Sequence, residues 1–331
     1  MSDLDAVKAL AEADFSDVAD RFSKAGFAVQ LPAKGILQIV SRAPEQGQQR
    51  RLRLLLSVGV HGDETAPIEV VAHLLNALFK TPQDLQTDLM VVVGNLDAIV
   101  QGKRFIDADL NRMFTDERGA LQATAEAARA DIIMRATAAF FGAGGGEKWH
   151  LDLHTAIRKS HYPTFAVVPA VITSRGRQAL MAWLGGAGIG AMILNSQLAP
   201  TYSAYTATKF GAVACTAELG QIGVLGQNDL NQFAVTAAAI DAMLRSGATL
   251  AFRRVLPHVF EVEQEIVKRS DDFSMSFDRS TENFTPLQPG AEIARDSTGT
   301  YVVGAATEYV VFPNPDVRVG QRAGLMVVRR L

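Results

Sequence analysis

Strand-like and helix-like segments alternate along most of this chain, and this alternation limits its fold more than any other feature. Short apolar runs rich in strand-forming residues are followed by segments of helical length. This order predicts an α/β domain whose sheet is at least partly parallel. We expect strands within residues 29–40, 51–60 and 89–94, up to residue 154, and at 164–169, 191–195 and 212–217, with helices near 65–79, 120–141 and 229–244.

Two helix ends carry recognisable signals. Pro67 lies in the first turn of the helix expected at 65–79, where its missing N–H costs no hydrogen bond. Asn228 is the expected cap of the helix at 229–244.

The pattern changes beyond residue 251. The segment HVFEVEQEIVKR alternates polar and apolar residues with a period of two, as a half-buried strand does. Prolines and a glycine then separate short runs up to the last residue (Pro286, Pro289, Gly290, Pro313 and Pro315). We therefore predict an α/β domain over residues 1–250 and a smaller all-β C-terminal domain over 251–331.

Composition excludes several classes of protein. The formal net charge of −3 over 331 residues argues against nucleic acid as the main partner. Cys215 is the only cysteine and cannot form an internal disulfide, and the first thirty residues lack the pattern of a signal peptide. The long uncharged stretch from Gln178 is interrupted too early to span a membrane and predicts a helix, a glycine turn and a strand. We expect a cytoplasmic protein with no membrane partner.

Three of the apolar runs end in a polar side chain. His61 follows SVGV, His154 follows LDL, and Glu218 follows VACTA. In open α/β sheets, ligands bind outside the carboxyl ends of the strands. We therefore expect these three side chains to meet at one edge of the sheet.

His61 and Glu64 are candidate ligands of a zinc ion. They lie three residues apart across a Gly62 turn, and in turn or helical geometry such positions share one side. Zinc accepts imidazole nitrogen and carboxylate oxygen, and catalytic zinc sites keep three protein ligands and a water. His258 and Glu261 have the same spacing but lie in an alternating, strand-like segment, where their side chains point to opposite faces.

The third ligand is expected from the segment WHLDLHTA. His150, Asp152 and His154 share one face of a strand there, about 7 Å apart. One metal ion near the loops would take only one of them, and we choose His154 because it lies at the downstream end. Asp152 either orients a ligating imidazole or is a plain structural acid.

Glu218 is the candidate proton-transfer group. It follows a run without other charges, and a carboxyl group in an apolar setting has a raised pKa that suits general acid–base work. The alternative is an acid paired with a surface lysine.

The segment GKRFIDADLNRMF at 102–114, which we call the arginine loop, is rich in groups that bind anions. Arg104 and Arg112 can each grip a carboxylate with two hydrogen bonds, and Asn111 adds a donor and an acceptor. Asp107 and Asp109 would hold the arginines in place. The alternative is an exposed loop whose charges neutralise one another. Further positive charge could come from three residues that are otherwise surface groups (Arg158, Lys159 and Lys209).

Four motifs in order resemble those of the aspartoacylase and succinylglutamate desuccinylase family. They are HGDETAPIE, GKRFIDADLNRMF, DLHTAIR and AELG. Two tail segments, GQNDLNQFAVTAAAI and EYVVFPNPDVRVGQRAGLM, are similar to the succinylglutamate desuccinylase branch, so the resemblance covers nearly the whole chain. It implies a zinc-carboxypeptidase-like mixed sheet flanked by helices, followed by a β-rich domain that shapes the entrance.

The resemblance also implies an activity and a set of site residues. The activity is hydrolysis of N-succinyl-L-glutamate to succinate and L-glutamate, in arginine catabolism. By position, one Zn²⁺ per chain would be held by three ligands (His61, Glu64 and His154). Glu218 would transfer protons, with Arg104 assisting catalysis, and the substrate would be bound by loop residues (Arg104, Asn111 and Arg112).

Two positions depart from the family pattern. Asp63 replaces the asparagine of many relatives, and Thr208 and Lys209 stand where aspartoacylases use an arginine. The second departure weakens an acetylaspartate activity and leaves Lys209 as a possible replacement. The alternatives left open are a deacylase of another N-acyl amino acid, a carboxypeptidase, and a silent binding protein on the same scaffold.

Overall fold

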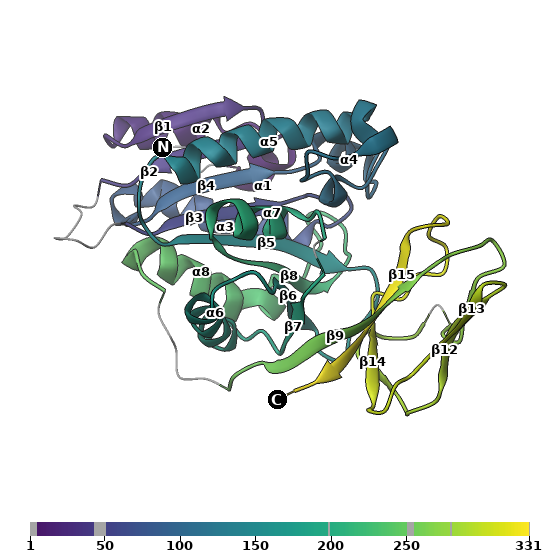
Figure 1. The fold of residues 1–331 in the computed structure, drawn as a ribbon. Helices are drawn as coiled ribbons and strands as arrows, with labels where there is room; N and C mark the ends of the chain where they lie inside the picture. The colour runs from purple at the N-terminus through teal and green to yellow at the C-terminus, as the bar shows by residue number, and fades with distance from the viewer. Residues whose placement is uncertain (1–4, 43–50, 198, 250–254, 279, 331) are drawn as a thin grey trace.

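The computed structural model describes residues 5–42, 51–197, 199–249, 255–278 and 280–330 (Figure 1). Within these ranges the strands form a 12-stranded sheet and a separate 3-stranded sheet. The order in the large sheet is β1-β2-β4-β3-β5-β8-β6-β7-β9-β15-β14-β11.

The first eight strands build the α/β part of the sheet. Their bounds are β1 (Ala28–Ala33), β2 (Ile36–Val40), β3 (Arg53–Val58), β4 (Asp88–Val93), β5 (Lys148–Ala156), β6 (Thr164–Pro169), β7 (Ala191–Asn195) and β8 (Val213–Gln221). Strands β4, β3, β5 and β8 run parallel to one another, whereas β2 pairs with β4 and β6 pairs with β8 antiparallel. The predicted mixed α/β sheet is confirmed. The carboxyl ends of the four parallel strands lie at one edge.

Helices flank this sheet (Figure 1). The α-helices are α1 (Ala6–Ala11), α2 (Ser16–Lys24), α3 (Ala66–Lys80), α4 (Leu96–Gln101), α5 (Ala125–Gly142), α6 (Ser174–Gly186), α7 (Tyr202–Phe210) and α8 (Ala234–Ser246). The 3₁₀ turns are η1 (Pro82–Asp84), η2 (Leu110–Arg112), η3 (Gly119–Ala123) and η4 (Leu230–Phe233). None of the helices in the described ranges is both long enough and apolar enough to cross a bilayer.

Strands do lie within residues 29–40, as two antiparallel strands, because the chain reverses at Gly35, which has a positive φ of 73°. One local prediction is corrected. Asn228 does not cap the helix that follows it. Asp229 caps the 3₁₀ turn η4 by accepting from the Asn231 N–H, and α8 begins only at Ala234.

The buried strands explain the long apolar runs of the sequence. Strand β4 is buried at every position, and β5 is buried at every position after Lys148. Helices cover both faces of a parallel sheet, so such strands lose the alternation of polar and apolar residues. Cys215 on β8 is buried and free.

In the described part of the C-terminal region, every regular secondary-structure element is a strand. These are β9 (His258–Val267), β10 (Ser274–Met275), β11 (Thr285–Leu287), β12 (Glu292–Asp296), β13 (Gly299–Val302), β14 (Glu308–Val311) and β15 (Arg322–Arg329). They gather at the end of the molecule opposite β1 (Figure 1). Strand β9 pairs with β7, so the large sheet continues into this region. The predicted boundary at residues 250 and 251 lies outside the described residues.

Candidate active site

His61, Glu64 and His154 come together at the carboxyl edge of the parallel strands. His61 lies three residues beyond β3, Glu64 lies just before α3, and His154 lies near the end of the neighbouring strand β5. The turn between the first two needs glycine, because a Cβ on Gly62 would lie 2.2 Å from the carbonyl carbon of Ala98. Strand pairing and this tight turn therefore fix the three positions.

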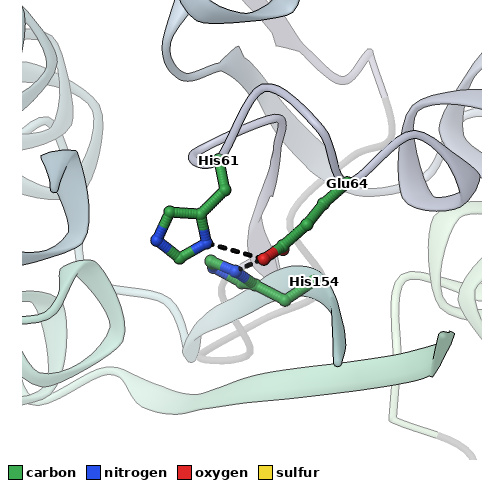
Figure 2. Close-up of side chains that lie close together, drawn as sticks. All are labelled: His61, Glu64 and His154. Carbon is green, nitrogen blue, oxygen red and sulfur yellow. Dashed lines mark hydrogen bonds and ion pairs between the residues drawn. The ribbon is translucent and has the colours of Figure 1, made fainter. Parts of the chain in front are cut away.

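The side chains of these residues point toward one another (Figure 2). Glu64 lies between the imidazoles, with Oε1 2.8 Å from His61 Nδ1 and Oε2 2.8 Å from His154 Nδ1. All three side chains are buried, and one ligand atom from each lies within 4.8 Å of the others. Two imidazole nitrogens and one carboxylate oxygen are a donor set that zinc accepts. The residues present fit a metal ion of this kind.

The electrostatics of the cluster favour positive charge. Burial lowers the pKa of His154, but Asp152 and Glu64 outweigh it and hold that pKa well above its usual range. Burial raises the pKa of Glu64, but His61 and His154 reverse this and hold it well below its usual range. A site whose carboxylates stabilise an imidazolium also stabilises a divalent cation in its place.

Each imidazole also meets an acid on its outer side. His61 Nε2 lies 2.9 Å from Asp109 Oδ1, and His154 Nε2 lies 3.1 Å from Asp152 Oδ2. Asp152 therefore contacts the imidazole that we expected it to orient. Asp109 contacts His61 and accepts from the Asn111 N–H at 2.8 Å, and its carboxylate also attracts Arg104 and Arg112, the arginines that we expected it to hold. Asp107 instead accepts from the Ala125 N–H at the start of α5.

Glu218 faces the cluster from the next strand. It is paired in register with His154 across β5 and β8 and is 6% exposed. Its Oε2 is buried and has no hydrogen-bond partner among the described residues. Burial, followed by repulsion from Glu64, raises the pKa of Glu218 to about 7. The raised pKa that we predicted from the apolar surroundings is confirmed.

The arginine loop lies against the cluster and is not an exposed, self-neutralising loop. Arg104 donates to Glu64 Oε1 at 2.8 Å, and its carbonyl accepts from the Gly62 N–H. Asn111 is buried, and its Oδ1 accepts from the Tyr202 N–H at 2.9 Å. Arg112 donates to the Asn111 carbonyl. The structure therefore brings Arg104 to the cluster and gives Asn111 a contact that sequence could not show.

Two of the other cations that we considered have contacts of their own. Lys209 is 57% exposed and lies 3.9 Å from Asp116. Arg158 donates to carbonyls of the C-terminal region at Asp278 and Thr281. Among the described residues, Lys209 therefore shows no contact that would replace the missing arginine of aspartoacylases.

Sequence reasoning missed Glu126, which holds the arginine loop. This buried acid in the first turn of α5 accepts backbone N–H groups from the loop and the amide of Asn95 at 3.1 Å. The loop donors are Ile106 at 2.7 Å, Asp107 at 3.2 Å and Ala108 at 3.2 Å. An acid in the first turn of a long helix is the signal that could have found it, but such acids also serve the helix dipole alone.

Comparisons with known proteins agree with this architecture. Residues 50–244 match the succinylglutamate desuccinylase/aspartoacylase catalytic domain, and residues 256–330 match the AstE/AspA barrel-sandwich hybrid domain. The chain is 41% identical to the succinylglutamate desuccinylase of Burkholderia thailandensis, over 89% of this chain and 84% of the relative. It is 42% identical to that of Burkholderia orbicola, over 84% of this chain and 81% of the relative.

Solved structures show the same similarity. The succinylglutamate desuccinylase of Chromobacterium violaceum matches with a TM-score of 0.79 and 33% identity, covering 96% of this chain and 98% of that chain. Murine aminoacylase 3 matches in fold alone, with a TM-score of 0.56 and 18% identity over 86% of this chain and 97% of that chain. The predicted zinc-carboxypeptidase-like fold class is confirmed. The chain belongs to the succinylglutamate desuccinylase/aspartoacylase family.

Proposed function

We propose that this chain hydrolyses N-succinyl-L-glutamate to succinate and L-glutamate. The observation that carries the proposal is a buried carboxyl group, Glu218, facing a His–Glu–His cluster from the adjacent strand. The curated relatives that match most of the chain are succinylglutamate desuccinylases, which supports this substrate. The reaction would serve arginine catabolism through succinylated intermediates, in the cytoplasm.

The cofactor that we propose is one zinc ion per chain, held by His61, Glu64 and His154. When bound, zinc supplies Lewis acidity, which acidifies a water and polarises a carbonyl. The buried cluster with ligand atoms within 4.8 Å supports this assignment. Asp109 and Asp152 keep the outer nitrogens of the two imidazoles engaged, so that each Nδ1 is left for the metal.

Glu218 is the proposed proton carrier. A pKa of about 7 lets its carboxylate take a proton from the attacking water near neutral pH. The same carboxyl group then returns the proton to the amine of the departing glutamate. Its Oε2 has no hydrogen-bond partner among the described residues and is free for both transfers.

The arginine loop is the proposed anion-binding element. Arg104 uses one of its five N–H groups on Glu64, which leaves others for the oxygen of the scissile carbonyl as negative charge develops there. Arg112 and Asn111 would hold a carboxylate of the substrate. The substrate carries three carboxylates, and this accounts for arginines concentrated in one loop of a net acidic chain.

We propose a separate role for each of the two predicted domains. Residues 1–250 would form the catalytic domain, and residues 251–331 a β-rich domain that shapes the entrance. The two separate family matches, at 50–244 and 256–330, support this division. We propose that nucleic acids and membranes are not partners, in keeping with the net charge of −3.

The test compares three substrates on metal-analysed protein. Succinate release from N-succinyl-L-glutamate should exceed hydrolysis of N-acetyl-L-aspartate and of a short peptide. Faster hydrolysis of either rival substrate would reassign the chain to an aspartoacylase-like deacylase or a carboxypeptidase. Absence of all three activities in zinc-loaded protein would indicate a silent binding protein.

A further inference from the structure

A buried chain of hydrogen bonds runs from Asp152, the acid beside His154, into the core of the sheet. Asp152, which contacts His154, accepts from the Ser57 hydroxyl at 2.5 Å. Ser57 Oγ lies 2.8 Å from His150 Nε2, and His150 Nδ1 lies 2.8 Å from Thr206 Oγ1. Ser57 and Asp152 are register partners on β3 and β5, so the pairing of these strands fixes their contact.

The direction of each bond follows from counting protons. Ser57 has one hydroxyl proton and gives it to Asp152, so its bond to His150 uses the proton on Nε2 of that ring. Burial lowers the pKa of His150 to about 4, so the ring is neutral and its Nδ1 is an acceptor for the Thr206 hydroxyl. Thr206 shares that proton with the Ser203 carbonyl at 3.0 Å. The donors along the chain therefore point toward Asp152.

This orientation decides which nitrogen of His154 keeps its proton when a metal ion is bound. Asp152 has one oxygen filled by Ser57 and the other 3.1 Å from His154 Nε2. An ionised carboxylate only accepts, so Nε2 keeps its proton against Asp152, and Nδ1, which lies 2.8 Å from Glu64 Oε2, is the nitrogen that would give up its proton to a bound cation.

Neither Ser57 nor His150 can act on the substrate directly. Both have no exposed surface, and His150 packs edge-on against Tyr202 with ring centroids 4.4 Å apart. Burying a hydroxyl and an imidazole in a sheet core is costly, and apolar residues would fill such positions without that cost. Their contribution must pass through the one charged group that they reach, Asp152.

We propose that Ser57 and His150 are positioning residues, which hold Asp152 so that the His154 imidazole presents its Nδ1 to the metal ion. This inference rests on the zinc site proposed above. It assigns a role to two polar residues of the core that neither contact the cluster nor line the arginine loop.

The experiment measures the zinc dissociation constant of the full chain by competition with a chromogenic chelator. Ser57→Ala should weaken zinc binding about tenfold, because Asp152 and His150 each lose a partner. His150→Leu should weaken it to a similar extent, whereas His150→Gln keeps an N–H donor for Ser57 and should lose less. Thr87→Val is the matched control, since Thr87 is equally buried and donates to the Met243 carbonyl away from the cluster.

Thermal unfolding of the metal-free proteins separates positioning from simple stability. Ser57→Ala and Thr87→Val should lower the melting temperature of the metal-free chain to a similar extent, while only Ser57→Ala weakens zinc binding. Unchanged zinc affinity in Ser57→Ala would overturn the proposal. If Ser57→Ala does not fold, the comparison of His150→Leu with His150→Gln tests the proposal instead. Equal zinc affinities of these two variants would also overturn it.

The same measurements distinguish this inference from the proposed function. A wild-type chain that binds zinc but releases no succinate would remove the proposed activity and leave the zinc comparison intact. A wild-type chain that binds no zinc would remove the positioning role as well.

Discussion

The two imidazoles of the cluster are held in different ways. His154 is backed by Asp152, which is fully buried and lies within the hydrogen-bonded core of the sheet. His61 is backed by Asp109, whose side chain is 23% exposed and belongs to the arginine loop. The first support is set by strand register, and the second by a loop that also carries the candidate substrate-binding arginines.

This difference divides the site into two parts. We call the side chains on β5 and β8 the sheet half, and the arginine loop the loop half. In the sheet half, the β3, β5 and β8 ladders fix the backbone of every participating residue. In the loop half, a few contacts hold the backbone, chiefly those to Glu126 and the bond from Gly62 to Arg104. Segments held by few contacts open more easily than core strands. We expect the sheet half to govern metal affinity and proton transfer, and the loop half to govern substrate binding.

The largest effect should come from Glu218, the proposed proton carrier of the sheet half. Glu218→Ala should lower kcat by about 10²–10⁴-fold, because the group that moves the proton is lost. Zinc content, measured by elemental analysis, should stay at the wild-type level. Loss of zinc in this variant would make Glu218 a ligand and contradict its assignment.

The next largest effect is on zinc affinity, and it should differ between the two acids that contact the outer nitrogens of the imidazoles. Asp152→Asn should weaken zinc binding by about 10–100-fold, because an amide offers one acceptor oxygen where Ser57 and His154 need two. Asp109→Asn should weaken it less, since solvent and the loop can adjust around a partly exposed side chain. Competition titration of both variants measures the difference. Equal losses would erase the distinction between the two halves.

A smaller effect is expected from the loop half at Arg112. Arg112→Lys should raise KM about tenfold with little change in kcat, because an ammonium cannot reproduce the two-pronged grip on a carboxylate. Zinc affinity should not change. Arg175→Lys, at an exposed position of α6, is the matched control. Wild-type kinetics in Arg112→Lys would remove Arg112 from the pocket.

The smallest effect tests the anchor of the loop. Glu126→Gln should destabilise the chain by about 1–3 kcal/mol, because backbone N–H groups of the loop lose acceptor oxygens. Hydrogen exchange at residues 106–108 should speed up. Glu308→Gln is the control, as Glu308 is a buried acid of the C-terminal region that accepts from the Gly304 N–H. Equal exchange at 106–108 in both variants would show that Glu126 does not hold the loop.

The sequence predicted those parts of the fold and site that depend on local residue patterns and on the order of the strands. His61, His154 and Glu218 could be predicted to meet, because each follows an apolar run and parallel strands end at one edge. The mixed sheet and the β-rich C-terminal region followed from the same patterns.

What could not be predicted depends on contacts between distant segments. Asp109 contacts His61 across 48 positions, and Glu126 reaches the arginine loop only because α5 packs beside it. His150 shares a strand face with Asp152 and His154 in the sequence, but its bond to Ser57 requires the pairing of β3 with β5. Nothing local distinguishes such residues from ordinary polar side chains.

The most direct test of the central claim is succinate release from N-succinyl-L-glutamate, followed while the metal is removed and returned. The account predicts one zinc ion per chain, loss of succinate release on chelation, and its recovery on addition of zinc. Full activity of the metal-free chain, or a zinc-loaded chain that releases no succinate, would contradict it.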